Sequence, residues 1–568
     1  MSDNNNIKTI TGAQALMEAM EREGVREVFG LPGGANLPMY DEFNRCNIRH
    51  ILVRHEQSAA HMADGYGRVS RKPGVCFATS GPGATNILTG IATAQADSAP
   101  MIAVTGQVNV NMIGKDAFQE SDIMGMANPV VKYAFQPRTP QEVPLAVQKG
   151  FYIASTGRPG PVLIDIPKDV QSGCAHIRYV DEFKIQGYHP WTEPDVNNIG
   201  RAIDTLIRSD KPIILAGGGT IISSAFAELQ ALAEFLSIPV VTTFKGKGAF
   251  PENHALSLGP IGMHGHAEAN KIISEADCVL AIGTRFSDRS VGTFEEFESH
   301  RSIIHMDVDP AEIGKNQTTN VAVVGDVRAT LRIMLATLQE GGISKTEGGE
   351  WVRHAQEMHR YWQENLKIHP GELGAAHILR KLREVLPGDS IITTEVGQHQ
   401  MWASLFFDVI TPGTFFSSTG LGTMGWGFPA AIGAKVARPD VPVVDIAGDG
   451  SFNMTENSLA TSILEDIPVI VFLVNNYSLG MVAQWQRTFY DRRMVGVDQG
   501  QCPDYVKLAE SYGAQGIRAH TLDELEAAIK TAVKSDVATV IDIPIDPEED
   551  VLPFVAPGTP LTKMILPS

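Results

Sequence analysis

The sequence predicts an α/β protein made of three doubly wound parallel-sheet domains. Throughout the chain, short apolar runs typical of buried strands alternate with helical patterns, an order that favours parallel strands joined by crossover helices. The length of 568 residues is ample for about three or four domains of ordinary size. A weak internal echo relates Gly65–Gly81 to Ala430–Gly448: each combines a small-residue helix, a turn with a basic residue and a proline, a strand and a glycine-containing loop. The echo indicates two related nucleotide-type sheets that flank a middle domain.

Turn-rich stretches divide the chain into these domains. Residues 187–195 (GYHPWTEPD) have no hydrophobic period and predict a linker, and the polar, glycine-rich residues 340–350 close the second part. The expected domains are therefore residues 1–186, 187–345 and 365–568. The apolar runs expected to form their strands are VREVFGL, IRHILV, VCFATS, MIAVTG and VLIDIP; then PIILAG, IPVVTT, CVLAIG and SIIHMDVD; then SIITTE, VPVVDIAG, VIVFLVNN and TVIDIPI.

The overall charge argues against some partners. A formal net charge of −19 and a pI of about 5.3 disfavour nucleic acid or an anionic membrane as the main partner. An anionic substrate is still compatible, since a local cluster of Arg and Lys can override the global field. No apolar run approaches the roughly 20 residues needed to span a bilayer. The N-terminal MSDNNNIKTITG has neither an apolar signal core nor an Arg-rich transit pattern, so a cytoplasmic location is expected.

The cysteine pattern indicates a reducing compartment. The five cysteines are odd in number and widely spaced, and no Cys-x-x-Cys pair exists, so neither a disulfide framework nor a zinc site is expected. Each is predicted to be a small buried apolar side chain. They are Cys46, Cys76, Cys174, Cys278 and Cys502.

The most specific motif is a Gly-Asp-Gly-Ser loop after one apolar run and an Asn-Asn pair at the end of the next. Asp449 ends VPVVDIA, Asn475 and Asn476 end VIVFLVNN, and TENSLATSILED between them predicts a crossover helix. Both polar groups would lie at carboxyl ends of parallel strands, where open α/β sheets bind ligands. Mg²⁺ typically takes one or two carboxylates with phosphate oxygens and water, and the N–H groups of Gly450 and Ser451 favour a diphosphate. A tight turn with an Asx cap is the alternative, which the spacing and strand placement disfavour.

Glu56 ends the run IRHILV, within RHEQSAA. The chain has 65 acidic residues, and most are expected on the solvated surface. A carboxyl group that follows a buried strand can instead be shielded from water and exchange a proton with a bound molecule. From its position alone, Glu56 is therefore expected at the surface, with a screened, proton-exchanging carboxyl group as the alternative.

The middle part of the chain carries the pattern of a dinucleotide-binding crevice. Gly217–Gly219 follows the run PIILA, GMHG occupies 262–265, and Asp307 lies at the end of the run SIIHMD. A glycine-rich turn after one strand and an acid at the end of a later one suit a dinucleotide. Taken alone this signal is weak, because three glycines form many turns.

Two further patterns could contribute to a ligand site. Arg289, in GTRFSDRSVG, could clamp a carboxylate through two hydrogen bonds, with a surface ion pair as the alternative. Met481 and Trp485 lie four residues apart in SLGMVAQWQ, which predicts a helix that begins beside the candidate metal ligands. The two side chains would share one helical face, which could line a pocket or simply pack into the core.

Together these motifs resemble the thiamine diphosphate enzymes of the pyruvate-decarboxylase-like superfamily and, within it, the catalytic large subunits of the acetolactate synthase (acetohydroxyacid synthase) family. The resemblance covers nearly the whole chain, and many motifs in the right order are far more specific than any one. The motifs are RHEQSAAHMADGYGR, TSGPGATN, DAFQE, TGRPGPVLIDIPKD, GMHG, GQHQMW, GLGTMG, GDGSF, NNYSLGMVAQWQ and VLPFVAPG.

The resemblance implies an N-terminal domain for the pyrimidine of thiamine diphosphate, a central FAD-binding-like domain, and a C-terminal domain for the diphosphate and Mg²⁺. The implied enzyme decarboxylates pyruvate and condenses the hydroxyethyl carbanion with a second pyruvate or 2-ketobutyrate, the first common step of valine, leucine and isoleucine biosynthesis. Net condensation needs no oxidant, so FAD would be structural or inherited. A homodimer or homotetramer is implied, with Glu56 and Asp449 of each active site from different subunits, together with a small regulatory subunit.

The resemblance also implies roles for individual residues. Glu56 would stabilise the imino form of the aminopyrimidine, and the metal would be held by Asp449, Asn476 and the carbonyl of Ser478. The catalytic set would be Glu56, Gln119, Lys168 and Arg289, and the acceptor's side chain would meet Phe118, Met481 and Trp485. Thiamine diphosphate would contact Pro32, Gly34, Pro82, Asn86, Gly397, Gln398, His399, Gly422, Met424, Gly450, Ser451, Met454, Gly480 and Met481. FAD would contact Arg158, Gly217, Gly219, Thr243, Met263, His264, Arg285, Asp307 and Asp326.

Two alternatives remain open at this point. The first is another enzyme of the same scaffold, either a pyruvate oxidase that passes electrons to flavin or another 2-keto acid carboligase or decarboxylase. The second is a catalytically silent relative that acts as a binding or regulatory subunit, which the intact Glu56, Asp449 and Asn476 argue against.

Overall fold

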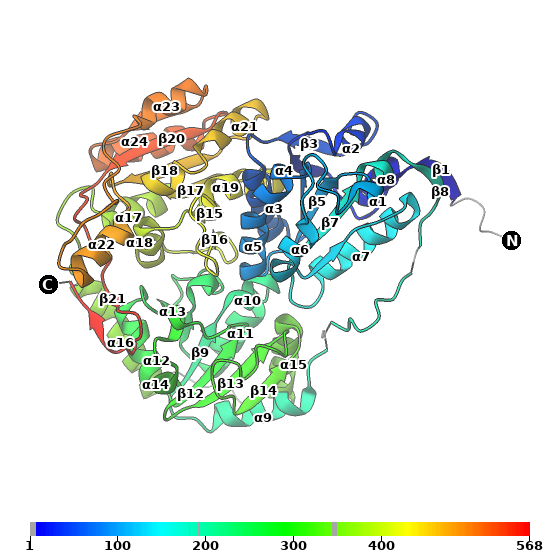
Figure 1. Cartoon of the computed structure of the whole chain (residues 1–568). Coiled ribbons are helices and arrows are strands. Elements are labelled where there is room, and N and C mark those ends of the chain that lie inside the picture. Colours follow the sequence, from blue (N-terminus) through cyan, green and yellow to red (C-terminus); the bar gives the residue numbers. More distant parts are fainter. Residues whose placement is uncertain (1–6, 181, 191–192, 343–348, 568) are drawn as a thin grey trace.

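A computed structural model describes the chain except for residues 1–6, 181, 191–192, 343–348 and 568. Its core consists of three six-stranded sheets, each with only parallel strands and each covered by helices. Figure 1 shows the three domains as the blue, green and yellow-to-orange parts of the ribbon. The predicted α/β fold with three doubly wound sheets is confirmed.

The N-terminal sheet has the strand order β3-β2-β4-β5-β7-β6. Its strands are β2 (Glu27–Gly30), β3 (Arg49–Leu52), β4 (Gly74–Ala78), β5 (Met101–Gln107), β6 (Tyr133–Phe135) and β7 (Pro161–Pro167). Its helices are α1 (Gly12–Arg22), α2 (Leu37–Glu42), α3 (Glu56–Ser70), α4 (Pro82–Asn86), α5 (Leu88–Asp97), α6 (Ile123–Ala127), α7 (Val143–Ser155) and α8 (Lys168–Ser172). A separate antiparallel pair joins β1 (Ile7–Thr11) to β8 (Cys174–Arg178).

The central sheet has the order β11-β10-β9-β12-β13-β14, which is the 3-2-1-4-5-6 order of dinucleotide-binding folds. Its strands are β9 (Pro212–Ala216), β10 (Val240–Thr242), β11 (Ser257–Pro260), β12 (Cys278–Ile282), β13 (Ser302–Asp307) and β14 (Val321–Val324). Its helices are α9 (Val196–Ile207), α10 (Gly218–Ile222), α11 (Phe226–Leu236), α12 (Ala267–Glu275), α13 (Asp288–Val291), α14 (Phe294–Glu298) and α15 (Val327–Glu340).

The C-terminal sheet has the order β16-β15-β17-β18-β20-β19. Its strands are β15 (Ile391–Thr394), β16 (Phe415–Ser417), β17 (Val443–Gly448), β18 (Ile470–Asn475), β19 (Gln515–Arg518) and β20 (Thr539–Pro544). Its helices are α17 (Ala375–Val385), α18 (Gln398–Phe406), α19 (Gly427–Ala437), α20 (Asp449–Phe452), α21 (Leu459–Leu464), α22 (Gly480–Phe489), α23 (Tyr505–Ser511) and α24 (Leu522–Val533).

The internal echo corresponds to a shared topology. Numbered within their own domains, the strands of both outer sheets follow the order 2-1-3-4-6-5. The two echoing helices, α3 and α19, pack directly against each other. Gly65 lies against the carbonyl oxygen of Ala430, and Gly433 lies against that of Met62, so a Cβ at either glycine would overlap backbone. Glycine therefore permits this close packing between the first and third domains.

Two segments near the expected domain boundaries pack on the central domain. Helix α16 (Glu350–Asn365) lies largely in the stretch that the sequence left unassigned, and the Trp351 indole donates a hydrogen bond to the Pro212 carbonyl at 2.9 Å. The C-terminal tail with β21 (Phe554–Val555) and β22 (Met564–Ile565) also returns there, since the Val555 N–H donates to the Met263 carbonyl at 2.8 Å (Figure 1). The last part of the chain thus serves two domains.

The cysteine prediction is partly wrong. All five are free, and Cys76 and Cys278 lie in strands and are buried as expected, whereas Cys174 and Cys502 are exposed and Cys46 is half-buried. Cys174 starts the antiparallel strand β8 and Cys502 lies in a loop, where no core covers them. None of the helices in the described parts of the chain combines the length and apolar character that crossing a bilayer requires.

Candidate active site

The Gly-Asp-Gly-Ser loop lies where the C-terminal sheet reverses its strand order. Strands β15 and β17 are neighbours, but the chain runs outward from them in opposite directions, which opens a crevice at their carboxyl ends. The loop after β15 leads through Gly397 into α18. Asp449 directly follows β17 and is the first residue of α20. Asn475 is the last residue of β18 and Asn476 follows it. The two predicted motifs therefore meet at one edge of the sheet.

The three predicted metal ligands lie together. The Ser478 N–H donates to the Asn476 side-chain oxygen at 3.2 Å and also hydrogen-bonds the Asp449 carboxylate. One Asp449 carboxylate oxygen is buried and has no hydrogen-bond partner. Burial raises the pKa of this carboxyl group to about 7. A cation would satisfy the unpartnered oxygen, so this donor set fits a divalent metal.

The donor set suits Mg²⁺ rather than a softer metal. In the described parts of the chain, no group of three or more His, Cys, Asp or Glu side chains is placed to hold a metal ion. Asp449 provides one carboxylate and its neighbours provide amide and carbonyl oxygens, which matches a site completed by phosphate oxygens and water. Asn475 has a different position, because its amide donates to Asp542 at 2.9 Å.

Several of the residues predicted to contact the cofactor lie at this same edge of the C-terminal sheet. The Gln398 side-chain oxygen accepts from the Asn476 amide at 2.9 Å and so orients that ligand. Gly480 lies against the same Gln398 oxygen, which leaves no room for a Cβ. His399 is buried with Nε2 unpartnered, and burial lowers its pKa to about 3, so it is a neutral ring next to Gly448. Met424 is half-buried, whereas Met454 is 55 % exposed.

Glu395 is a site residue that the sequence analysis missed. It is fully buried, and its carboxylate accepts from the Ser451 hydroxyl at 2.7 Å and from the N–H groups of Gly425 (2.7 Å) and Phe428 (3.0 Å). Burial raises the pKa of this carboxyl group. Glu395 thus connects the Gly-Asp-Gly-Ser loop to the loop that leads into α19. An acid at the end of the run SIITTE, directly before Val396 and the GQHQMW motif, was the available signal.

The second group of predicted residues lies at the carboxyl edge of the N-terminal sheet. Glu56 is the first residue of α3 and lies four positions beyond the end of β3. The expectation that it ends a strand is therefore wrong. Its carboxylate is 8 % exposed and accepts from the Asn86 amide at 3.0 Å. Gly83 lies beside the same carboxylate, and Gly81 packs against Gln119. The loop that follows β4 therefore lies against Glu56, and Gln119, in the segment after β5, packs against that loop.

Much of this edge is open to solvent. Phe118 is 89 % exposed, and the remaining exposed residues predicted here are Pro32, Gly34, Pro82 and Lys168.

A large cavity of about 1270 Å³ lies where the three domains meet. It exceeds the roughly 300–1,000 Å³ typical of small-ligand pockets, so it can hold a dinucleotide. Its walls include the ends of β9 and β12, at the point where the central sheet reverses its order. All predicted FAD contacts except Gly217 line it: Arg158, Gly219, Thr243, Met263, His264, Arg285, Asp307 and Asp326. Gly217 instead packs on the backbone of Gly283.

Some polar groups in the cavity wall already have hydrogen-bond or ion-pair partners in the protein, whereas others do not. Arg158 is paired with Glu312 at 2.7 Å, and Asp326 caps α15 by accepting the Ala329 N–H at 2.9 Å. His264 is buried with Nε2 unpartnered, and its ring stacks on Phe554 with centroids 5.2 Å apart. Burial raises the pKa of the Asp307 carboxyl group to about 6. An unpartnered imidazole and a desolvated acid at a strand end fit a polar ligand such as a dinucleotide.

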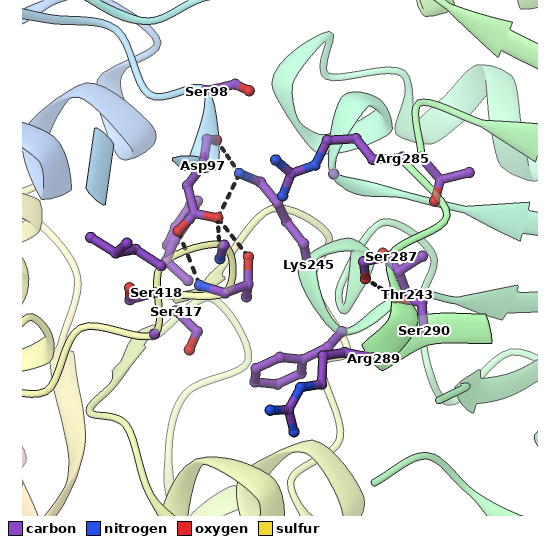
Figure 2. A pocket seen from close by; sticks show the side chains of 18 of the residues that line it. Asp97, Ser98, Thr243, Lys245, Arg285, Ser287, Arg289, Ser290, Ser417 and Ser418 are labelled. Carbon is purple, nitrogen blue, oxygen red and sulfur yellow. Dashed lines mark hydrogen bonds and ion pairs between the residues drawn. The ribbon is translucent and has the colours of Figure 1, made fainter. Parts of the chain in front are cut away.

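Three of the predicted substrate residues, Arg289, Met481 and Trp485, line the same cavity, whereas Phe118, Gln119 and Lys168 do not. Helix α22 presents Met481 and Trp485 to it, and the Trp485 indole N–H is buried without a partner. The Arg289 guanidinium lies 5.7 Å from the centroid of the Trp485 ring, and Figure 2 shows Arg289 among the side chains of the cavity wall. Gly422 lines the cavity as well, so the cavity extends from the central domain to the C-terminal cofactor edge.

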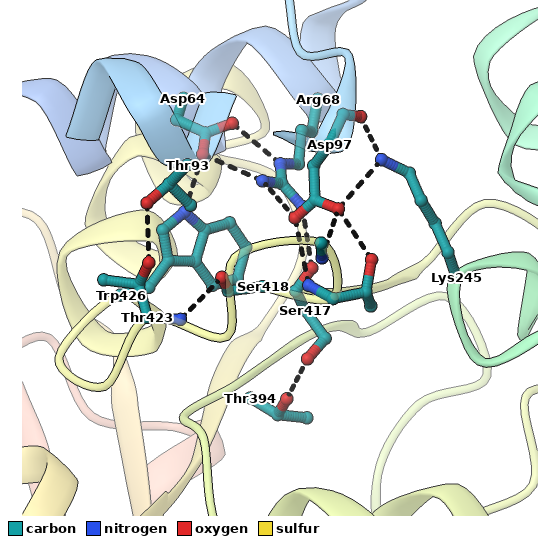
Figure 3. Close-up of polar contacts among 12 residues, drawn as sticks. Asp64, Arg68, Thr93, Asp97, Lys245, Thr394, Ser417, Ser418, Thr423 and Trp426 are labelled. Atoms are coloured by element: carbon teal, nitrogen blue, oxygen red, sulfur yellow. Dashed lines mark hydrogen bonds and ion pairs between the residues drawn. The ribbon is translucent and has the colours of Figure 1, made fainter. Parts of the chain in front are cut away.

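A buried polar cluster, whose Arg68 and Asp97 also line this cavity, links the outer domains (Figure 3). Arg68 of α3 forms ion pairs with Asp64 (2.7 Å) and Asp97 (3.1 Å), and the Trp426 indole donates to Asp64 at 2.7 Å. Asp97 also accepts from the Thr419 hydroxyl at 2.6 Å. The bonds that join the two domains, Trp426 to Asp64 and Thr419 to Asp97, span 362 and 322 positions of the chain, so no local pattern indicates them.

The predicted site residues do not all share one space in a single chain. The cavity contains Arg289, Met481 and Trp485 in its walls. Among the described residues, its lining includes neither Glu56 with its neighbours Asn86 and Gln119 nor the predicted metal ligands Asp449 and Asn476.

Comparison with known proteins connects these geometries to a family. Residues 10–126, 199–334 and 395–543 match the thiamine pyrophosphate enzyme N-terminal TPP binding domain, central domain and C-terminal TPP binding domain. A probable acetolactate synthase large subunit from Methanocaldococcus jannaschii is 48 % identical over 98 % of this chain and 95 % of its own length. An acetolactate synthase large subunit from Cyanidium caldarium is 42 % identical over 98 % and 96 %, and an acetolactate synthase from Mycobacterium bovis is 43 % identical over 97 % and 91 %.

Proposed function

The chain belongs to the thiamine pyrophosphate enzymes and, among them, to the acetolactate synthase large subunits, and from this premise we propose a role for each site residue. The enzyme decarboxylates pyruvate with thiamine diphosphate and joins the two-carbon remainder to a second 2-keto acid, a step of branched-chain amino-acid synthesis. The observation that carries the assignment of residues is the unpartnered, buried Asp449 carboxylate beside Asn476 at the switch point of the C-terminal sheet.

Thiamine diphosphate, when bound, supplies the electron sink that decarboxylation and carbon–carbon bond formation need. Asp449, Asn476 and the Ser478 carbonyl would hold Mg²⁺ against the diphosphate. Glu395 fixes the Ser451 hydroxyl and the Gly425 N–H in place for the same loop. Glu56, almost fully screened from water, would hold a proton at its carboxyl group for the aminopyrimidine. Arg289 would orient the keto-acid carboxylate.

FAD is the proposed occupant of the central part of the cavity. The 3-2-1-4-5-6 order of the sheet, the glycine-rich turn after β9 and the acidic end of β13 support a dinucleotide there. Because the condensation is redox-neutral, the flavin would act as a structural part of the cavity wall. A small regulatory partner is proposed because the related chains are named large subunits. The expected cytoplasmic location stays a prediction.

We further propose that the active unit is at least a dimer in which the partner copy covers the exposed edge around Glu56. Phe118 is almost fully exposed, and the Glu56 group lies outside the cavity that contains Trp485. A second copy placed over this edge would complete both groups at once and bury the phenylalanine.

Mixed dimers test this arrangement. If Glu56 and Asp449 of one active site come from different chains, a dimer of one Glu56→Gln chain and one Asp449→Ala chain contains one doubly altered site and one intact site. Two inactive variants, separately tagged, coexpressed and purified as the mixed species, should therefore regain up to half of the wild-type acetolactate synthesis per dimer. Continued inactivity of the correctly assembled mixed dimer would show that both residues act within one chain.

The activity itself is tested by incubating purified protein with pyruvate, thiamine diphosphate and magnesium and measuring acetolactate. Formation of acetolactate without oxygen uptake is expected. Anaerobic bleaching of bound flavin by pyruvate with no acetolactate would identify a pyruvate oxidase instead.

Trp485 should set the choice of the second keto acid. 2-Ketobutyrate exceeds pyruvate by one methylene group, which in an apolar pocket is worth about 1–3 kcal/mol, or roughly 10–200-fold in selectivity. Trp485→Leu should therefore lower the preference for 2-ketobutyrate by on the order of tenfold while acetolactate formation from pyruvate stays substantial. Competition with both acceptors present measures the product ratio.

Thr488 offers the matched control, since it is exposed on the same helix and does not line the cavity. Thr488→Ala should leave the ratio closer to that of the wild type. An unchanged ratio in Trp485→Leu, or equal loss of both products, would reduce Trp485 to general packing.

A further inference from the structure

Lys245 lies across the glycine-rich turn of the central sheet. It belongs to the short 3₁₀ helix η5 (Phe244–Gly246) that follows β10, and it lines the large cavity. A Cβ added at Gly218 would lie only 2.6–2.8 Å from the Cγ, Cδ and Cε atoms of Lys245. The aliphatic part of this lysine therefore rests directly on the turn after β9, at the switch point where a dinucleotide places its diphosphate.

Asp97 holds the other end of this lysine. The Lys245 ammonium contacts the Asp97 carbonyl oxygen and lies 3.2 Å from its carboxylate (Figure 2). The same carboxylate also accepts from Arg68 at 3.1 Å and from the N–H groups of Thr419 (3.0 Å) and Gly420 (2.9 Å). Since Asp97 is shared among so many donors, it neutralises Lys245 only in part.

A second cation, Arg285, lies at the same part of the cavity wall as Lys245. Within the described parts of the chain, the Arg285 guanidinium forms no ion pair or side-chain hydrogen bond, although it lies close enough to Lys245 to act on its charge. Arg285 follows β12, on the other side of the switch point from Gly218. Figure 2 shows its side chain extending toward that of Lys245. Two cations therefore flank the glycine-rich turn at the cavity wall.

The electrostatics of this arrangement favour an anionic ligand. Burial lowers the pKa of the Lys245 ammonium to about 7, an effect that Asp97 opposes and that Arg68 and Arg285 reinforce. A charged ammonium in this buried position is thus costly unless an anion balances it. A diphosphate between Lys245 and Arg285 would balance both charges and form charge-assisted hydrogen bonds.

We propose that Lys245 is an anion-binding residue of the dinucleotide cavity, held over the glycine-rich turn by Asp97 so that it contacts the ligand's diphosphate together with Arg285. This inference rests on the proposed flavin site and adds to it a residue and the chemical group that it recognises. Asp97 also connects Lys245 to the C-terminal loop at Thr419, since it binds both side chains.

Lys245→Met tests the proposal, because methionine keeps an unbranched apolar stem over Gly218 but removes the charge. Calorimetry and flavin fluorescence should show FAD affinity reduced about 10-fold to 100-fold, the range expected for a lost hydrogen bond to a charged group. ADP, which retains the diphosphate, should weaken similarly, whereas any binding of riboflavin, which lacks it, should be unchanged. Lys245→Arg should recover most of the affinity.

Lys271→Met is the matched control, since Lys271 is exposed on α12 and outside the cavity. It should bind FAD and ADP like the wild type. The dependence of FAD affinity on salt concentration should become shallower in Lys245→Met and stay unchanged in Lys271→Met.

The possible failures are distinguishable. If the wild type binds no FAD, the flavin site itself is wrong and the inference falls with it. If the wild type binds FAD and Lys245→Met binds it equally well, Lys245 is only a structural contact to Asp97, which a melting temperature lowered equally by Lys245→Met and Asp97→Asn would show. Equal losses for riboflavin and FAD would place Lys245 at the flavin ring and overturn the diphosphate contact.

Discussion

Replacement of Asp449 by alanine should abolish magnesium-dependent binding of thiamine diphosphate. Asp449 is the carboxylate of the candidate metal site, and one of its oxygens is buried with no protein partner. Loss of outer partners of metal ligands typically costs 10–100-fold in metal affinity, so loss of the charged ligand itself should cost at least about 100-fold. Calorimetric titration with thiamine diphosphate in the presence of magnesium measures this directly. Wild-type affinity in Asp449→Ala would refute the site.

The ligand-free protein provides an independent test at the same residue. Because burial raises the pKa of the Asp449 carboxyl group to about 7, its ionisation costs folding free energy that appears as the pH rises above the ordinary value and is complete above about 7. Ligand-free Asp449→Asn should therefore melt at a higher temperature than the wild type at pH 8, with a difference that shrinks toward pH 5. Addition of thiamine diphosphate and magnesium should stabilise the wild type more than this variant. A lower melting temperature for the ligand-free variant at pH 8 would contradict the uncompensated burial of the carboxylate.

Glu56→Gln should retain thiamine diphosphate binding but slow deprotonation of the cofactor by about 100-fold to 10,000-fold, the range of a general acid–base contribution. Glutamine preserves the size of the side chain, but its amide cannot hold or release the proton as a carboxyl group does. The metal ligands lie in another domain and stay intact. Hydrogen–deuterium exchange at the thiazolium carbon, followed by NMR after acid quench, measures the step without requiring turnover.

Glu27→Gln is a suitable control, because Glu27 lies in β2 of the same domain and accepts a hydrogen bond from Tyr66 at 3.3 Å outside the Glu56 group. It should exchange at the wild-type rate. Unimpaired exchange in Glu56→Gln would remove Glu56 from the proton-transfer step and leave its bond to Asn86 as a structural contact.

Central strands could be read from the sequence, whereas most edge strands could not. The apolar runs predicted the interior strands of all three sheets, such as β5 and β18, because both faces of these strands are covered. In the three six-stranded sheets, the strands not singled out are β6, β11, β14, β16 and β19, all at sheet edges. Edge strands are short here and pair on one side only, so they need no continuous apolar run.

Local motifs likewise predicted individual site residues but not which other residues lie beside them. The Gly-Asp-Gly-Ser loop and the Asn pair could be placed together because two consecutive parallel strands bring their carboxyl ends to one edge. Glu395 escaped notice because its role depends on Ser451 and Gly425 donating to it across a folded crevice. Lys245 escaped because its contact with Asp97 crosses 148 positions of the chain.

The sequence by itself determined the three parallel sheets, the family, and the residue types at each cofactor edge, because periodicity and short motifs are properties of neighbouring residues. Only the tertiary structure decided which of those edges share a space. It joined the flavin residues to Arg289, Met481 and Trp485 in one cavity, left Glu56 at an exposed edge outside it, and placed Asp97 between all three domains. These relations depend on how α3 packs against α19 and on which polar groups meet where the domains join. No local pattern encodes them, since the contacting residues are set by the closure of the whole chain.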